Sequence, residues 1–115
     1  MKIHLICPVR KISEEIDKML DDYVVELESK GHTVHYPKRD VCQDDDGIGL
    51  SICQHHLTNM KSADEVHILW DADSKGSHFD FGMAFAMDKT IRLIQQHDRV
   101  DHKSYGNVLL TIQSK

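Results

Sequence analysis

The chain has 115 residues, of which 40% are hydrophobic and 29% charged, and its formal net charge is -5. This composition is typical of one globular domain, residues 1–115, with room for one core and one site. An acidic chain lacks the basic stripe of a general nucleic-acid binder, so we expect no nucleic-acid partner. Its apolar runs fall short of the roughly 18 residues that a membrane helix needs, and its start lacks a secretory signal. These features predict a cytoplasmic protein with no membrane partner.

Three cysteines and nine histidines raise the questions of disulfides and of metal binding. Cys7, Cys42 and Cys53 form no Cys-x-x-Cys pair, so we expect free thiols. The histidines are scattered, and their spacings include neither His-x-x-x-His nor His-Glu-x-x-His. The sequence therefore predicts no metal site and no cofactor.

Hydrophobic periodicity predicts strands that alternate with helices. We expect strands at residues 2–7, 33–36, 65–70, 90–94 and 108–112, and helices at residues 13–30, 49–62 and 77–87. Residues 38–47 and 97–106 are polar and predict loops, the first of them exposed and mobile. Such alternation is typical of a parallel sheet with helices on both faces. The predicted fold class is therefore α/β, a three-layer sandwich around a mainly parallel five-stranded sheet.

The stretch from residue 70 to residue 86 joins a buried strand, a polar loop and the start of a helix. Ligands bind at this edge of an open α/β sheet. Ser74, Gly76 and Ser77 provide hydroxyls and accessible backbone amides at the helix start, which favour an anion. The loop after the first strand ends at the same edge, so Arg10 can supply a matching cation.

Each of these residues also has a purely structural interpretation. Ser77 and Asp80 have the spacing of a capping box, although glutamate is the usual partner in that motif. Arg10 can be a solvated loop charge, and Trp70 and His78 can be packing residues at the edge of the pocket. The residues alone leave these alternatives open.

The motif GSHFDFGMA at residues 76–84, with the strand that ends at Trp70 and Asp71, resembles the nucleoside 2-deoxyribosyltransferase superfamily, including its nucleoside-monophosphate N-glycosidases. The resemblance covers most of the chain. It implies a flavodoxin-like (Rossmann-like) fold and cleavage of an N-glycosidic bond by a carboxylate nucleophile. Asp80 stands where that family has a glutamate, so the resemblance implies that Asp80 is the nucleophile.

The same resemblance implies roles for other residues. Ser74, six positions before Asp80, and Arg10 match phosphate-contacting positions of the hydrolases, which favours a nucleoside 5′-monophosphate over a free nucleoside. Asp71 matches an aspartate that contacts the base or assists its departure. The family's habit of sharing sites between subunits implies a homodimer or a higher homo-oligomer. The residues expected to bind substrate are Cys7, Pro8, Arg10, Asp73, Ser74, Gly76, Ser77 and His78.

The exchange of glutamate for Asp80 keeps two further functions open. An aspartate is one methylene, about 1.5 Å, shorter, and such a displacement can cost on the order of a hundredfold in rate. The first alternative is therefore a non-catalytic module of the same fold that binds or senses nucleotides. A weaker alternative is an NAD glycohydrolase, since Toll/interleukin-receptor domains share the sheet and a carboxylate nucleophile.

Overall fold

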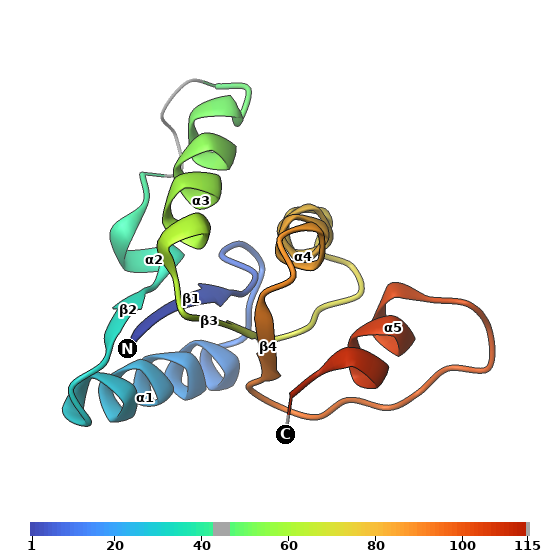
Figure 1. The fold of residues 1–115 in the computed structure, drawn as a ribbon. Helices are drawn as coiled ribbons and strands as arrows, with labels where there is room; N and C mark the ends of the chain where they lie inside the picture. Colours follow the sequence, from blue (N-terminus) through green and yellow to red (C-terminus); the bar gives the residue numbers. More distant parts are fainter. Residues whose placement is uncertain (43–46, 115) are drawn as a thin grey trace.

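The computed structural model describes residues 1–42 and 47–114, and it contains a parallel sheet with helices on both faces (Figure 1). Within this described part the sheet has four strands, in the order β2-β1-β3-β4. Their bounds are β1 (Lys2–Ile6), β2 (Thr33–His35), β3 (Glu65–Ile68) and β4 (Thr90–Leu93). In the register, His4 of β1 is paired with His35 of β2 and with Val66 of β3.

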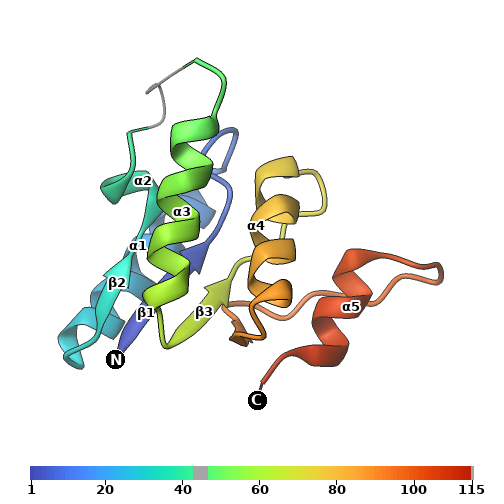
Figure 2. The ribbon, with the colours of Figure 1, turned by 45° about the horizontal axis from the view of Figure 1, so that its top comes forward.

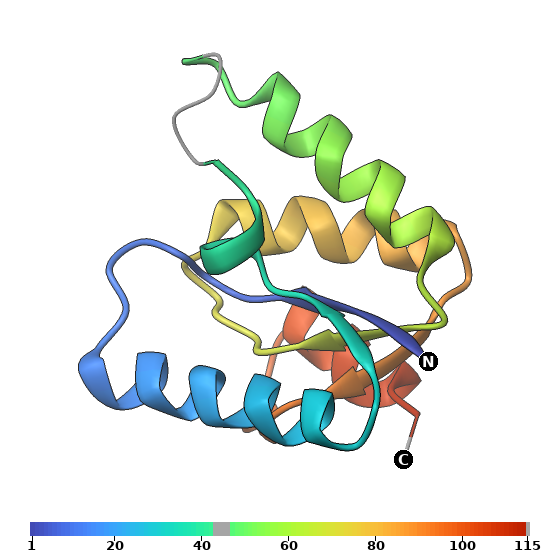
Figure 3. The ribbon, with the colours of Figure 1, turned by 90° about the vertical axis from the view of Figure 1, so that its left-hand side faces the viewer.

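Five helices accompany the sheet in the described residues: α1 (Glu14–Ser29), α2 (Pro37–Asp40), α3 (Leu50–Ser62), α4 (Lys75–Ala86) and α5 (Tyr105–Ile112). Helices α3 and α4 cover one face, and α1 covers the other (Figure 3). Helix α5 lies beyond β4, beside that edge of the sheet (Figure 2). The α/β class and the layered architecture are thus confirmed. None of the helices in the described part combines the length and the apolar character needed to cross a membrane.

The core has two halves because side chains alternate between the faces of each strand. On the α1 side, Leu5 and Leu20 are buried in one apolar cluster. On the side of α3 and α4, Ile6, Ile68 and Phe81 belong to a second cluster. His4 and His35 replace apolar residues on this second face, and both are buried.

The predicted fifth strand is wrong, because residues 108–112 belong to helix α5. The hydroxyl of Ser104 accepts a hydrogen bond from the Asn107 backbone and so begins the helix upstream of the apolar run. Leu109 then turns inward and is fully buried. A short apolar run has no period of its own that separates a strand from a buried helix.

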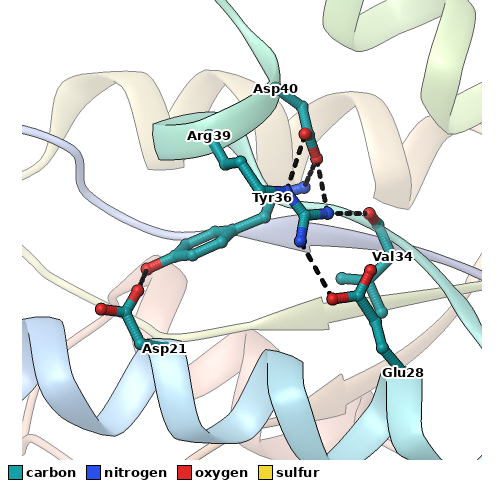
Figure 4. A network of polar contacts seen from close by, with 6 residues as sticks. All are labelled: Asp21, Glu28, Val34, Tyr36, Arg39 and Asp40. Atoms are coloured by element: carbon teal, nitrogen blue, oxygen red, sulfur yellow. Dashed lines mark hydrogen bonds and ion pairs between the residues drawn. The ribbon is translucent and has the colours of Figure 1, made fainter.

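The loop predicted at residues 38–47 begins with a helix instead, since α2 includes Pro37 at its first turn. Arg39 of this helix donates hydrogen bonds to Glu28 of α1 and to Asp40 (Figure 4). Tyr36 donates its hydroxyl proton to Asp21 of α1 and its backbone N–H to Asp40. These bonds fasten the end of β2 to α1. The prediction of an exposed, mobile loop covers residues 38–47, and residues 43–46 of that range lie outside the described part of the chain.

Candidate functional site

The start of α4 is organised by the side chain of Ser74. Its hydroxyl accepts a hydrogen bond from the Ser77 N–H at 3.2 Å and donates one to the Ser77 hydroxyl at 2.9 Å. The Ser74 carbonyl accepts a hydrogen bond from Nδ1 of His78 at 2.7 Å. In the preceding turn, Oδ1 of Asp71 accepts a hydrogen bond from the Asp73 N–H at 2.9 Å. The loop before α4 is therefore held in place by its own polar groups.

The capping box between Ser77 and Asp80 is wrong, because Ser74 is the N-cap and the helix begins at Lys75. Ser77 is instead a buried residue of the first helical turn. Asp80 points toward α3, where its Oδ2 atom accepts a hydrogen bond from Nδ1 of His56 at 3.0 Å. Only 12% of the Asp80 side chain and 10% of the His56 side chain are exposed. The two residues form a buried pair between neighbouring helices.

His56 was given no role by the reasoning from the sequence. It lies on the inward face of the helix predicted at residues 49–62, among apolar residues. A polar side chain on such a face must find a hydrogen-bond partner, which is the signal that could have drawn attention to it. The partner itself is 24 positions away in the sequence, on another helix.

A pocket of about 970 Å³ lies at the carboxyl ends of the strands. Pro8 of the β1–α1 loop, Asp71 of the β3–α4 loop and His78 of α4 line it, so three of the predicted site residues meet there. The centroid of the His78 ring lies 4.5 Å from that of Trp70 and 5.7 Å from that of Tyr105. The pocket therefore has an aromatic wall, and the carboxylates of Asp71 and Asp98 also line it.

Several predicted residues lie outside this pocket. Asp80 is not among the described residues that line it, and neither are Ser74 and Ser77. Gly76 is exposed at the helix start. Arg10 and Asp73 are also exposed, in the loops before α1 and α4. Three of the ten predicted residues thus line the pocket, and four others, Ser74, Gly76, Ser77 and Asp80, lie at the N-cap and in the first two turns of α4.

Cys7, which was expected to bind substrate, is not among the described residues that line the pocket. It is buried at the end of β1, directly before Pro8, which lines the pocket. Burial raises the pKa of its thiol to about 12; the charge of Lys38 opposes that shift and the charge of Asp80 adds to it. The thiol is therefore neutral near pH 7 and cannot act as a thiolate nucleophile.

Four imidazole rings lie together where α3 packs on β1 and β2, and we call them the histidine cluster: His4, His35, His55 and His56. His4 and His35 are stacked with centroids 4.9 Å apart, and His35 and His55 are stacked at 5.0 Å. His4 Nδ1 donates to the amide oxygen of Asn59 at 2.9 Å. Burial lowers the pKa of both His4 and His35 to about 4, so both rings are neutral near pH 7. In the described residues, no group of three or more His, Cys, Asp or Glu side chains could hold a metal ion.

The fold resembles that of two solved enzymes. One is a 2-deoxyribosyltransferase from Bacillus psychrosaccharolyticus, with a TM-score of 0.76 at 18% identity over 98% of this chain and 82% of the other. The second is the CMP N-glycosidase BcmB of Clostridium botulinum, with a TM-score of 0.64 at 21% identity over 98% of this chain and 83% of the other. No family model matches the sequence, and no curated protein matches it. The likeness shows that this chain shares the fold of these two enzymes, which is the fold that the sequence resemblance implied.

Replacing Gly106 with alanine should disturb the aromatic wall of the pocket. A Cβ atom there would lie 2.9 Å from Nε1 of Trp70 and 3.3 Å from Cε1 of His97, so the indole must move. We expect Gly106→Ala to lower the free energy of unfolding by about 1–3 kcal/mol and to shift the fluorescence of Trp70. Urea unfolding followed by tryptophan emission measures both, because Trp70 is the single tryptophan of the chain.

The matched control for this variant is Gly82→Ala. Gly82 also lies within a helix, and a Cβ added to it would meet no atom within 4 Å. We expect this substitution to raise the free energy of unfolding by up to about 1 kcal/mol, the helix-propensity difference between alanine and glycine. Equal unfolding midpoints and equal spectra for the two variants would contradict the close packing of Gly106 on Trp70.

The neutral state of His4 predicts that acid weakens the fold. Folding lowers the pKa of His4 from 6.5 to about 4. Between these pH values the His4 ring is therefore protonated in the unfolded chain and neutral in the folded chain. The free energy of unfolding should therefore fall as the pH drops from about 6.5 to about 4. His4→Phe, which cannot titrate, should lose about 2–3 kcal/mol less between pH 7 and pH 4.5.

Urea unfolding of both proteins at the two pH values measures this difference. His4→Phe leaves the Asn59 amide without its partner, but that loss applies at both pH values and cancels from the comparison. Parallel pH dependence in the wild type and the variant would show that His4 titrates normally in the folded protein.

Proposed function

We propose that the protein breaks the N-glycosidic bond of a nucleoside 5′-monophosphate, by hydrolysis or by transfer of the sugar, with Asp80 as the nucleophile. The single observation that carries the proposal is the buried Asp80 carboxylate on α4, the helix whose His78 lines the pocket at the carboxyl edge of the sheet. The shared fold with two enzymes that act on such bonds supports it.

The aromatic wall of the pocket suits a nucleobase. Nucleobases stack favourably on aromatic side chains, and Trp70, His78 and Tyr105 offer three such rings. Tyr105 is largely exposed, so its ring is accessible to a ligand that enters from solvent. Asp71 lies at the same pocket and is the proposed acid that protonates the departing base.

The start of α4 suits the 5′-phosphate. The first backbone amides of a helix have no partner within it, and the helix dipole favours negative charge there. The turn that Ser74 and Ser77 hold together fixes those amides in position. Lys11 lines the pocket and Arg10 belongs to the same loop, and in this proposal that loop supplies the cations for the phosphate.

The proposed reaction has two steps. In the first, a carboxylate oxygen of Asp80 forms a bond to C1′, the bond between C1′ and the base breaks, and Asp71 gives its proton to the base. In the second, Asp71 takes a proton from a water molecule or from a second base, which then attacks C1′ and releases Asp80.

A nucleotide-binding module without catalysis is the second candidate function. One observation favours it: the Asp80 carboxylate lies outside the residues that line the pocket and is already hydrogen-bonded to His56. Such a module would use the aromatic wall and the start of α4 in the same way, but it would leave the nucleotide intact.

Incubation with ribonucleoside and deoxyribonucleoside 5′-monophosphates, followed by chromatography of the free bases, tests the first candidate. We expect base release by the wild type, none by Asp80→Ala, and at least a hundredfold slower release by Asp71→Asn, since general acid catalysis contributes about 10²–10⁴ in rate. Asp101→Asn is the matched control, because Asp101 is an exposed aspartate that does not line the pocket, and its rate should equal that of the wild type.

The thermal unfolding temperature separates the two candidates. Ligand binding to the folded state raises this temperature, so both candidates predict an increase with the correct nucleotide. An increase without any base release would favour the binding module, whereas no increase and no release with the whole panel would exclude both.

A further inference from the structure

We propose that His56 is the positioning residue for Asp80, holding one carboxylate oxygen so that the other faces the sugar. This inference rests on the proposed function and adds a residue from α3, which the sequence motif of α4 does not contain. It draws on the buried hydrogen bond between the two side chains and on the rings that surround His56.

The hydrogen bond defines the state of both partners. Nδ1 of His56 lies 3.0 Å from Oδ2 of Asp80, and both side chains are about nine-tenths buried. An ionised carboxylate only accepts hydrogen bonds, so Nδ1 of His56 must carry the proton. In a neutral ring the other nitrogen, Nε2, is then a bare acceptor. This agrees with the absence of any hydrogen-bond partner for Nε2 of His56 within the described residues.

Positioning matters more for this carboxylate than for a longer one. With about 1.5 Å less reach than a glutamate, the Asp80 side chain has fewer orientations in which an oxygen meets C1′. The bond to His56 engages Oδ2 and removes the rotation of the carboxylate group. Oδ1 is therefore the oxygen that attacks, and its direction is set before the substrate binds.

The ring of His56 is itself held in place by the histidine cluster. The rings of His4 and His35 contact it nearly at right angles, at 79° in both cases, with centroids 5.7 Å and 6.0 Å away. Burial keeps the pKa of His4 and His35 at about 4, so neither brings a positive charge that competes for Asp80 near pH 7. His4 is fastened in turn to Asn59, three residues after His56 on the same helix.

Three variants test the role of His56. His56→Leu removes the donor, and we expect kcat to fall at least tenfold while KM changes less than threefold, because the pocket that binds substrate is untouched. His56→Asn places an amide N–H close to the position of Nδ1 and should recover most of the lost kcat. His32→Asn changes a histidine in the segment between α1 and β2, outside the pocket lining and the histidine cluster, and should behave as the wild type.

A second measurement examines the hydrogen bond without relying on activity. Long-range ¹H–¹⁵N NMR spectra report which ring nitrogen carries the proton, and we expect the Nδ1–H form for His56 in the wild type. Asp80→Ala removes the acceptor and should shift the Nδ1 resonance of His56. Thermal unfolding of each variant confirms that a lost rate is not a lost fold.

The outcomes separate the two proposals. Full kcat in His56→Leu, or an Nε2–H form of His56 in the wild type, would overturn the positioning role while leaving the proposed function intact. A wild type that releases no base from any nucleotide would overturn the proposed function and with it any role of His56 in that reaction; the NMR result would then describe a structural pair only.

Discussion

The hydroxyl of Ser74 determines how α4 presents its side chains. Because it bonds to the Ser77 N–H, the helix begins at Lys75, and every later residue takes its direction from that start. Residues two positions apart on a helix point about 200° apart, so His78 and Asp80 face nearly opposite sides. His78 accordingly lines the pocket, whereas Asp80 turns toward α3. One cap thus separates the proposed base contact from the proposed nucleophile.

The face of the sheet beneath α3 carries polarity that a purely structural core would avoid. His4 lies on β1 and His35 on the adjacent strand β2, at buried positions where apolar side chains would pack without a desolvation cost. Burial keeps both rings neutral, and their Nε2 atoms have no partner in the described part of the chain. A buried acceptor without a partner costs free energy. The histidine cluster therefore lowers the free energy of unfolding relative to an apolar core, and its rings pack around His56, the partner of Asp80.

Much of the fold follows from the sequence because it rests on local signals. The cap at Ser13 and the helical spacing after it predict α1. The first two strands follow from their apolar residues and from the prolines at positions 8 and 37, which lie two residues beyond the end of each strand. The last element was assigned wrongly because a five-residue apolar run has no distinct period, and its cap at Ser104 lies outside that run. Local signals decide such cases only when the flanking residues are included.

The candidate site was less accessible from the sequence because its main contact is tertiary. Asp80 could be singled out by its motif, and Asp71 and Pro8 by their places at strand ends. The bond from His56 to Asp80 joins two helices and depends on the phase of each, which no spacing within one helix encodes. In this chain the geometry of the proposed nucleophile is therefore a property of two helices together rather than of the motif on one.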